Sequence, residues 1–139
     1  MKIYLYYIGK PRDPHANHMA GDFVARAARF VPCEMREIRP DRMDPWVRHP
    51  TGRKVLLDPG GRPMDSRAFQ ALVDRAATES RDLLFVVGGA DGLPAGWAER
   101  ADLLLSLSAM TFPHELARAM VAEQIYRALA ALRGHPYPR

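Results

Sequence analysis

The sequence predicts an α/β fold in which a largely parallel sheet is covered by helices on both faces. Short apolar runs alternate along the chain with helix-length stretches, which is the pattern of β and α elements in such folds. The run Leu83–Val87 is apolar at every position, as expected for a parallel strand that is buried on both faces. The length of 139 residues suits one core, so we expect a single domain over residues 1–139.

Five runs have the length and composition of strands, and most are bounded by glycine, proline or charged residues. They cover residues 2–8, 33–38, 55–58, 83–87 and 103–107. Helix-length stretches lie between and after them, at about residues 18–31, 65–79 and 113–133, with a short turn near 94–101. The segment 39–53 has three prolines and alternating charges without periodicity, which predicts a surface loop.

The helix expected at residues 113–133 has the clearest signals. Its apolar positions recur at near-helical spacing, at Leu116, Met120, Ile125, Leu129 and Leu132. Thr111 is a candidate N-cap, Pro113 suits the first turn, and Gly134 is a typical stop signal. The apolar stripe predicts contact with the core or with a partner helix.

Composition narrows the class of protein. Apolar residues make up 47% and charged residues 26%, which is the balance of a folded protein rather than a disordered chain. No apolar run approaches the roughly 18 residues that a membrane-spanning helix needs, and no signal-peptide cleavage pattern is visible. We therefore expect a cytoplasmic protein without a membrane partner. Cys33 is the sole cysteine and has no nearby ligand partners, so neither a disulfide nor a metal site is expected.

The net charge is +4 and arginine supplies most of the positive charge. Such a charge favours encounter with a polyanion, although it is common among proteins that bind none. The planar guanidinium of arginine also suits bidentate contacts with phosphate. Charge alone therefore leaves nucleic-acid binding open.

The places to look for a ligand site are the turns that follow the third, fourth and fifth strands. Ligands of open α/β sheets bind at the carboxyl ends of the strands, and three irregular loops would meet there, at residues 57–61, 88–93 and 106–114. The glycines in these loops let the backbone approach a ligand closely, or they simply turn the chain. The loop at 88–93 does not match a dinucleotide or triphosphate motif, and no nucleophile motif is present.

Four motifs over the last sixty residues carry a resemblance to a known family. They are Gly88-Gly-Ala-Asp-Gly-Leu93, Leu105-Ser-Leu-Ser-Ala-Met-Thr-Phe-Pro-His114, Glu123-Gln-Ile-Tyr-Arg127 and Gly134-His-Pro-Tyr137. In order and spacing they resemble the ribosomal RNA large subunit methyltransferase H family, which methylates N3 of a pseudouridine in helix 69 of 23S rRNA. The resemblance implies a SPOUT fold with a C-terminal trefoil knot, a homodimer acting on the ribosome, and S-adenosylmethionine as cofactor.

The resemblance also implies which residues form the site. Those expected to line the cofactor site are Leu57, Gly88, Leu107, Ser108, Ala109, Met110, Thr111 and Phe112. Their main-chain groups and hydroxyls can hydrogen-bond the ligand, and Leu57 and Phe112 can pack on an adenine.

Methylation of an imide nitrogen requires that its proton be removed, with help from a base or a cation. The candidates are His114, His135, Tyr137 and Arg139. His114 also fits a structural role at the start of a helix, and the other three also fit a frayed terminus.

Other residues of the last helix have two interpretations each. Arg118 and Arg127 suit contacts with rRNA or a second subunit, but also a solvated helix face. Tyr126 suits packing at a subunit interface better than chemistry.

Two departures from the family pattern affect the substrate rather than the cofactor. Pro138 stands where members usually have histidine, and the segment 39–54 is shorter than usual. Alternatives to the pseudouridine activity are another SPOUT base or ribose methylation, and a non-catalytic module that binds RNA or the ribosome.

Overall fold

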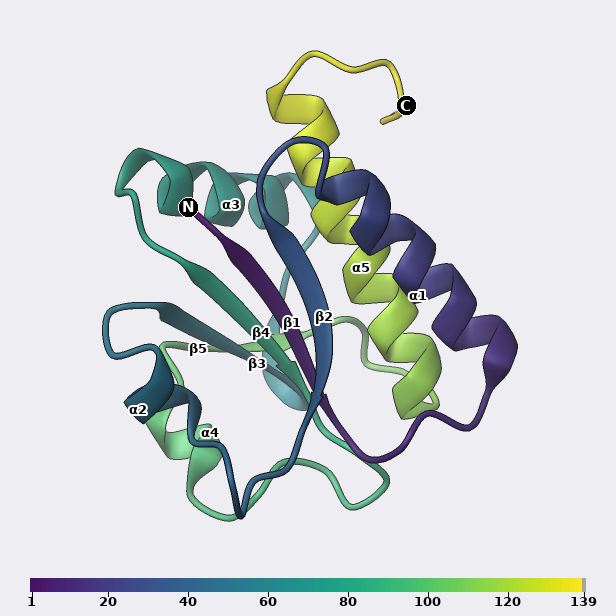
Figure 1. Cartoon of the computed structure of the whole chain (residues 1–139), viewed down its shortest axis with the longest axis vertical. Coiled ribbons are helices and arrows are strands. Elements are labelled where there is room, and N and C mark those ends of the chain that lie inside the picture. Colours follow the sequence, from purple (N-terminus) through teal and green to yellow (C-terminus); the bar gives the residue numbers. More distant parts are fainter. Residues whose placement is uncertain (139) are drawn as a thin grey trace.

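A five-stranded parallel sheet forms the centre of the protein in the computed structural model, which describes residues 1–138 (Figure 1). The strands are β1 Ile3–Ile8, β2 Cys33–Ile38, β3 Arg53–Pro63, β4 Leu83–Val87 and β5 Leu103–Ser106. Their order across the sheet is β2-β1-β4-β3-β5, and every pair is parallel. The predicted parallel α/β class and the five strand positions are confirmed.

Helices cover both faces of this sheet, but unequally. They are α1 Pro14–Ala27, α2 Pro45–Arg48, α3 Ser66–Thr78, α4 Trp97–Arg100 and α5 His114–Leu132. The long helix α5 packs against both α1 and α3 on one face, while the short helices α2 and α4 lie on the other (Figure 1). None of the helices within residues 1–138 is long and apolar enough to cross a membrane.

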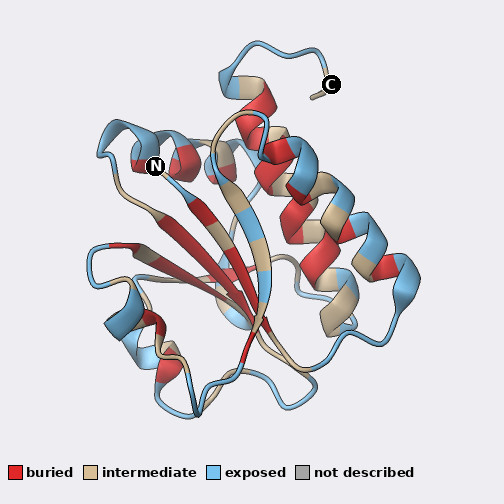
Figure 2. Cartoon of the chain, viewed as in Figure 1, coloured by how far each residue is buried: buried red, intermediate tan, exposed pale blue. Residues whose placement is uncertain are grey.

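The core follows from the alternation of side chains along the strands. In β4, Phe85 faces the long helices and stacks on Phe69 of α3, with ring centroids 5.3 Å apart. The alternate residues Leu84 and Val86 face the cluster that contains Trp97 of α4. All five residues of β4 are buried, and Figure 2 shows the buried strands at the centre of the sheet. The uninterrupted apolar run was therefore a correct signal for a strand buried on both faces.

Helix α1 begins four residues earlier than the sequence interpretation placed it. Asp13 is its N-cap, and the carboxylate accepts hydrogen bonds from the backbone N–H groups of His15 and Ala16. Pro14 occupies the first turn, where its missing N–H costs nothing. The helix also ends at Ala27 rather than at residue 31. The expected range was wrong at both ends because it followed apolar periodicity and passed over the Asp13-Pro14 start signal.

The segment 39–53 is not simply a loop, and the expectation there was wrong in part. It contains α2, whose N-cap Asp44 accepts from the backbone N–H of Trp46. Trp46 packs edge-on against Trp97, with ring centroids 5.4 Å apart, and the Arg100 guanidinium lies 4.2 Å from its ring centroid. This cluster fastens α2 to α4. A helix of one turn has too few residues to show a helical period.

Strand β3 is longer than expected because it contains an irregularity. Leu57 and Arg62 both pair with Leu105 of β5, so residues 58–61 form a bulge in the strand between them. This bulge forms one wall of the site described below.

The end of α5 agrees with its predicted stop signal. Gly134 has φ +69°, and the N–H groups of Gly134 and His135 donate to the carbonyls of Ala131 and Ala130. This is the double hydrogen bond of a Schellman motif. The expected cap at the start was wrong, since Pro113 is the N-cap residue and Thr111 does not cap. The trefoil knot stays a prediction.

Candidate active site

A pocket of about 260 Å³ lies at the carboxyl edge of the sheet, where β3, β4 and β5 end beside the first turn of α5. The three loops expected to converge do so. Of the expected cofactor residues, the pocket is lined by Leu57, Gly88, Leu107, Ser108, Met110, Thr111 and Phe112. Ala109 belongs to the same loop but does not line the pocket, and it is exposed.

The walls of the pocket are held by contacts between backbones at glycine positions. A Cβ atom on Gly88 would lie 2.6 Å from the backbone carbon of Gly92, and one on Gly61 would lie 2.7 Å from that of Leu104. Real Cβ atoms do not approach so closely, so both positions require glycine in this conformation. A side chain at Gly88 would therefore disturb the loop itself before it reached any ligand.

Two serines fix the loop that follows β5. The buried Ser106 hydroxyl donates to the carbonyl of Ser108 at 2.9 Å, and the Ser108 hydroxyl accepts from the N–H of Met110 at 3.0 Å. These bonds give the loop a defined shape. The Met110 side chain, at the pocket, is 72% exposed.

The sequence interpretation did not single out Asp58, which contributes the sole carboxylate among the lining residues. Its Oδ1 accepts a hydrogen bond from the N–H of Gly60 at 2.7 Å, which closes a local turn. The signal was present as the Asp58-Pro-Gly-Gly61 turn after a strand. Pro59, Gly89, Ala90 and Gly92 also line the pocket and belong to the expected loops, whereas Val87, Leu105 and Ala117 lie outside those loops.

The three candidates for proton transfer among the described residues do not come together in one protomer. His114 lines the pocket. His135 and Tyr137 lie beyond the opposite end of α5, and Arg139 lies outside the described residues. The Tyr137 hydroxyl donates to Oε2 of Glu123 at 2.7 Å. Glu123 lies more than two helical turns from His114, which is about 14 Å along the axis of α5.

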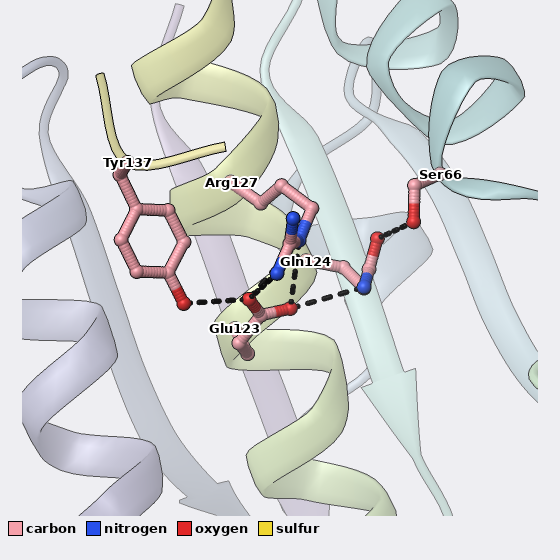
Figure 3. A network of polar contacts seen from close by, with 5 residues as sticks. All are labelled: Ser66, Glu123, Gln124, Arg127 and Tyr137. Atoms are coloured by element: carbon pink, nitrogen blue, oxygen red, sulfur yellow. Dashed lines mark hydrogen bonds and ion pairs between the residues drawn. The ribbon is translucent and has the colours of Figure 1, made fainter. Parts of the chain in front are cut away.

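A polar network holds the C-terminal tail against α5 (Figure 3). Glu123 accepts from Tyr137 and from the guanidinium of Arg127, whose Nη2 lies at 2.7 Å. Gln124 donates to Glu123 and accepts from Ser66 of α3. Burial, followed by the bond to Glu123, raises the pKa of Tyr137. The network links the motif at 123–127 to the motif at 134–137 through the bond between Glu123 and Tyr137, which explains why the two motifs occur together.

Aromatic packing reinforces this placement of the tail. The Tyr137 ring lies 4.6 Å from that of Tyr126, and Tyr126 also packs against Phe23 and Phe30. Tyr126 is buried within its own protomer. Its core packing is shown, and its place at a subunit interface stays a prediction.

Arg118 is fully buried, so the interpretations offered for it, contact with RNA or a second subunit and a solvated helix face, are wrong. Its guanidinium carbon lies 3.5 Å from the ring centroid of Tyr7, and Nη1 donates to Oδ1 of Asn17. Nε and Nη2 have no partner within residues 1–138. Burial lowers the pKa of Arg118.

Glu115 joins the first turn of α5 to the loop between β1 and α1. Its carboxylate accepts from the N–H of Arg12 at 2.6 Å, from the N–H of Asp13 at 3.1 Å and from the amide of Asn17 at 2.9 Å. These bonds, the one from Arg12 first, lower the pKa of Glu115 to about 2. The residue next to His114 thus anchors a loop that lies 103 positions away in sequence at Arg12.

A second hollow of about 510 Å³, here called the helix groove, lies between α1, α3 and α5. Its apolar lining includes Met19, Phe23, Met64, Phe69, Leu116 and Met120. Met19 is 49% exposed and Leu116 is 39% exposed, so this face presents apolar surface to solvent. Leu105 and Leu107 line both the groove and the pocket, which are therefore neighbours.

The described part of the chain holds no group of three His, Cys, Asp or Glu side chains placed to bind a metal ion. The pocket is instead built from apolar side chains and main-chain segments.

Comparison with known proteins defines the class to which this fold and pocket belong. A family model described as "Predicted SPOUT methyltransferase" matches residues 1–138, so the protein is a methyltransferase of the SPOUT class. Within that class the chain belongs to the ribosomal RNA large subunit methyltransferase H family, as its curated relatives demonstrate.

Two of these relatives match over nearly their whole lengths. The protein of that name from Solibacter usitatus (strain Ellin6076) is 68% identical over 139 residues, which is 100% of both chains. The one from Sorangium cellulosum (strain So ce56) is 36% identical over 143 residues and 99% of both chains. The full-length match with the Solibacter protein shows that a chain of this short length occurs in more than one member of the family.

Solved structures share the fold at low sequence identity. A probable methyltransferase from Bordetella pertussis Tohama I superimposes with a TM-score of 0.63 at 14% identity, over 92% of this chain and 94% of that chain. The SpoU methyltransferase AviRb from Streptomyces viridochromogenes, in complex with the cofactor AdoMet, gives a TM-score of 0.52 at 14% identity, over 91% and 57%.

Gly61 and Gly60 provide a matched test of how the pocket wall is held. Gly61→Ala should lower the free energy of unfolding by about 1–3 kcal/mol, because the new methyl overlaps the backbone of β5. In Gly60→Ala the new methyl meets just the Asp58 carboxylate, at 3.2 Å, so the cost should stay below about 1 kcal/mol. Urea unfolding measures both, and equal costs would contradict the role of the close approach.

Glu115→Gln tests the anchor of the β1–α1 loop through its pH dependence. The pKa of Glu115 falls from 4.5 to about 2 on folding, so the carboxylate stabilises the fold above about pH 4.5 and loses this effect as the pH falls toward 2. The melting-temperature difference between wild type and variant should therefore shrink on acidification through this window. Glu99→Gln, an exposed glutamate on α4, is the control and should show a small, flat difference.

Proposed function

We propose that this protein transfers a methyl group from S-adenosylmethionine to N3 of a pseudouridine in helix 69 of 23S rRNA, as a cytoplasmic homodimer acting on the ribosome. The observation that carries the proposal is the 68% identity, over the whole of both chains, with a ribosomal RNA large subunit methyltransferase H. The pocket supports it, because it is formed by the same loops that carry the motifs of that family.

The pocket has the features that this cofactor requires. Its volume of about 260 Å³ is near the roughly 300 Å³ lower limit of small-molecule sites, and its walls are mostly apolar. Leu57 and Phe112 can pack on an adenine, and the glycine loop exposes main-chain groups that can hydrogen-bond its edge. Asp58 can accept hydrogen bonds from ribose hydroxyls. The lining of this chain therefore fits the cofactor.

The protein has little to do chemically beyond positioning and proton transfer. S-adenosylmethionine supplies, when bound, a methyl group already activated on a sulfonium sulfur. The chain must hold the acceptor nitrogen in line with that methyl group and exclude competing water. The N3 proton must also leave, and His114, whose side chain lines the pocket, is our candidate to accept it.

The homodimer would bring the remaining candidates to the pocket. In one protomer the Tyr137 hydroxyl is bound to Glu123, which lies about 14 Å along α5 from His114. Tyr137 therefore does not reach the pocket of its own protomer. Two α5 helices packed in opposite directions would place each tail near the partner's pocket. The apolar helix groove beside α5 provides a surface for such packing.

The target nucleotide is tested by mapping methyl groups in 23S rRNA from a strain that lacks the gene, before and after the gene is restored. We expect one mass shift of a methyl group at a pseudouridine of helix 69, present only when the gene is present. A shift at another base or at a ribose would replace this proposal by a different SPOUT activity. No shift, with no S-adenosylmethionine binding by calorimetry, would indicate a non-catalytic module.

A mixture of two inactive variants tests whether the site is shared between protomers. Thr111→Trp changes an exposed residue and fills the pocket, while truncation after Gly134 removes the tail. Each homodimer should be inactive. In an equilibrated equal mixture about half of the dimers are heterodimers, and each of these has one intact pocket that meets one intact tail. The mixture should therefore recover roughly a quarter of wild-type activity. A chain carrying both changes, mixed with the truncated chain, is the control. Heterodimers that stay inactive would contradict a shared site.

A further inference from the structure

The loop between β1 and α1 carries two cations beside the pocket. Lys10 and Arg12 both have exposed side chains, and neither forms an ion pair within residues 1–138. In the sheet order, β1 is the direct neighbour of β4, whose glycine loop lines the pocket. Both loops leave the carboxyl edge of the sheet, so the two cations lie next to the site without lining it.

This loop is fixed at two points, each of which touches the pocket wall. At one, the backbone of Ile8 lies so close to Gly89 that a Cβ on Gly89 would be 2.9 Å from the Ile8 carbonyl oxygen. At the other, the N–H of Arg12 donates to Glu115, the residue after His114, at 2.6 Å. Figure 1 shows the loop passing the first turn of α5. The hydrogen bond to Glu115 therefore fixes the backbone of Arg12 relative to the pocket.

The carboxylates of Glu115 and Asp13, which lie near the loop, already accept hydrogen bonds from nearby N–H groups. Glu115 accepts from three N–H groups, and Asp13 caps α1 through the N–H groups of His15 and Ala16. These carboxylates hold the backbone, and neither pairs with the Lys10 or Arg12 side chain. The two cations are thus left facing solvent, with no anion among the described residues to bind.

The hydrogen bonds that hold the β1–α1 loop extend through Asn17 to the buried Arg118. Asn17, which donates to Glu115, also accepts from the fully buried Arg118, two of whose nitrogens have no partner within the described residues. Burying a guanidinium without a carboxylate partner is unfavourable, and the bond to Asn17 and the contact with the Tyr7 ring offset part of that penalty. Holding the β1–α1 loop against α5 is the purpose that the contacts indicate.

We propose that Lys10 and Arg12 bind phosphate groups of the RNA strand that flanks the target nucleotide, and that Glu115 is the positioning residue that sets their distance from the pocket. The inference rests on the proposed function, since it assumes an RNA substrate at the same pocket. A nucleotide held in the pocket has a phosphate on each side, and a basic loop at the rim meets one of them. Such contacts fix the register of a nucleic acid without reading its sequence.

The test compares the double variant Lys10→Ala/Arg12→Ala with wild type on ribosomes from a strain that lacks the methyltransferase. We expect KM for ribosomes to rise at least about tenfold, with kcat within about twofold and S-adenosylmethionine affinity unchanged. The slope of log(kcat/KM) against log salt should become shallower by about 0.7–0.9 for each phosphate that the variant no longer binds. Affinity for a helix 69 RNA fragment, which needs no methyl transfer, should weaken in parallel.

Two matched variants separate charge at this place from charge in general. Lys10→Arg/Arg12→Lys keeps both charges and should keep KM within about twofold of wild type. Arg29→Ala removes an exposed arginine beyond the other end of α1, which forms no ion pair within residues 1–138, and should leave KM and the salt slope unchanged. Glu115→Ala, which frees the loop, should raise KM while cofactor affinity is kept, and Glu115→Gln should restore much of the loss.

Three results would overturn the inference. They are an unchanged KM and salt slope in the double alanine variant, an equal loss in the charge-preserving variant, and a loss of S-adenosylmethionine affinity in the double variant. In each case wild type would still methylate its target, so the proposed function would stand. Failure of the proposed function would appear earlier, as wild-type protein that neither methylates ribosomes nor binds the cofactor.

Discussion

The pocket depends on direct contact between backbones at the carboxyl edge of the sheet. Gly88 lies against Gly92 within its own loop, Gly89 lies against the end of β1, and Gly61 lies against β5. At each place a single methyl group would overlap a neighbouring main chain, so the loops keep their shape only with glycine there. Four strands are thereby joined around one cavity.

Helix α5 connects this edge to the rest of the molecule. Its first turn lines the pocket with His114, and the next residue, Glu115, holds the β1–α1 loop. Its second half holds the C-terminal tail through Glu123, more than two turns away. Helix α5 therefore sets the distance between the pocket and the tail within one protomer, and in the proposed homodimer the partner would supply the tail at each site. Its burial against α1 and α3 makes that distance rigid.

The sequence predicted the strands, the long final helix and the loops of the pocket, because these leave local signals: continuous apolar runs, periodicity and glycine after a strand. It did not predict features that depend on distant partners. The return of β3 to pair twice with Leu105 requires β5, and Arg118 is buried because Tyr7 and Asn17 receive it. A surface arginine and a buried one look alike in a helical period, and Asp58 became a candidate through its place in the pocket wall.

The central claim is that the carboxyl-edge loops, and not the larger helix groove, form the cofactor site. Hydrogen exchange of the protein with and without S-adenosylmethionine tests it most directly, since bound ligand slows exchange in the segments that it covers. We expect slower exchange at residues 57–61, 88–92 and 107–112, with little change along the α1 and α3 walls of the groove. Slower exchange confined to those walls, with the three loops unaffected, would contradict the account.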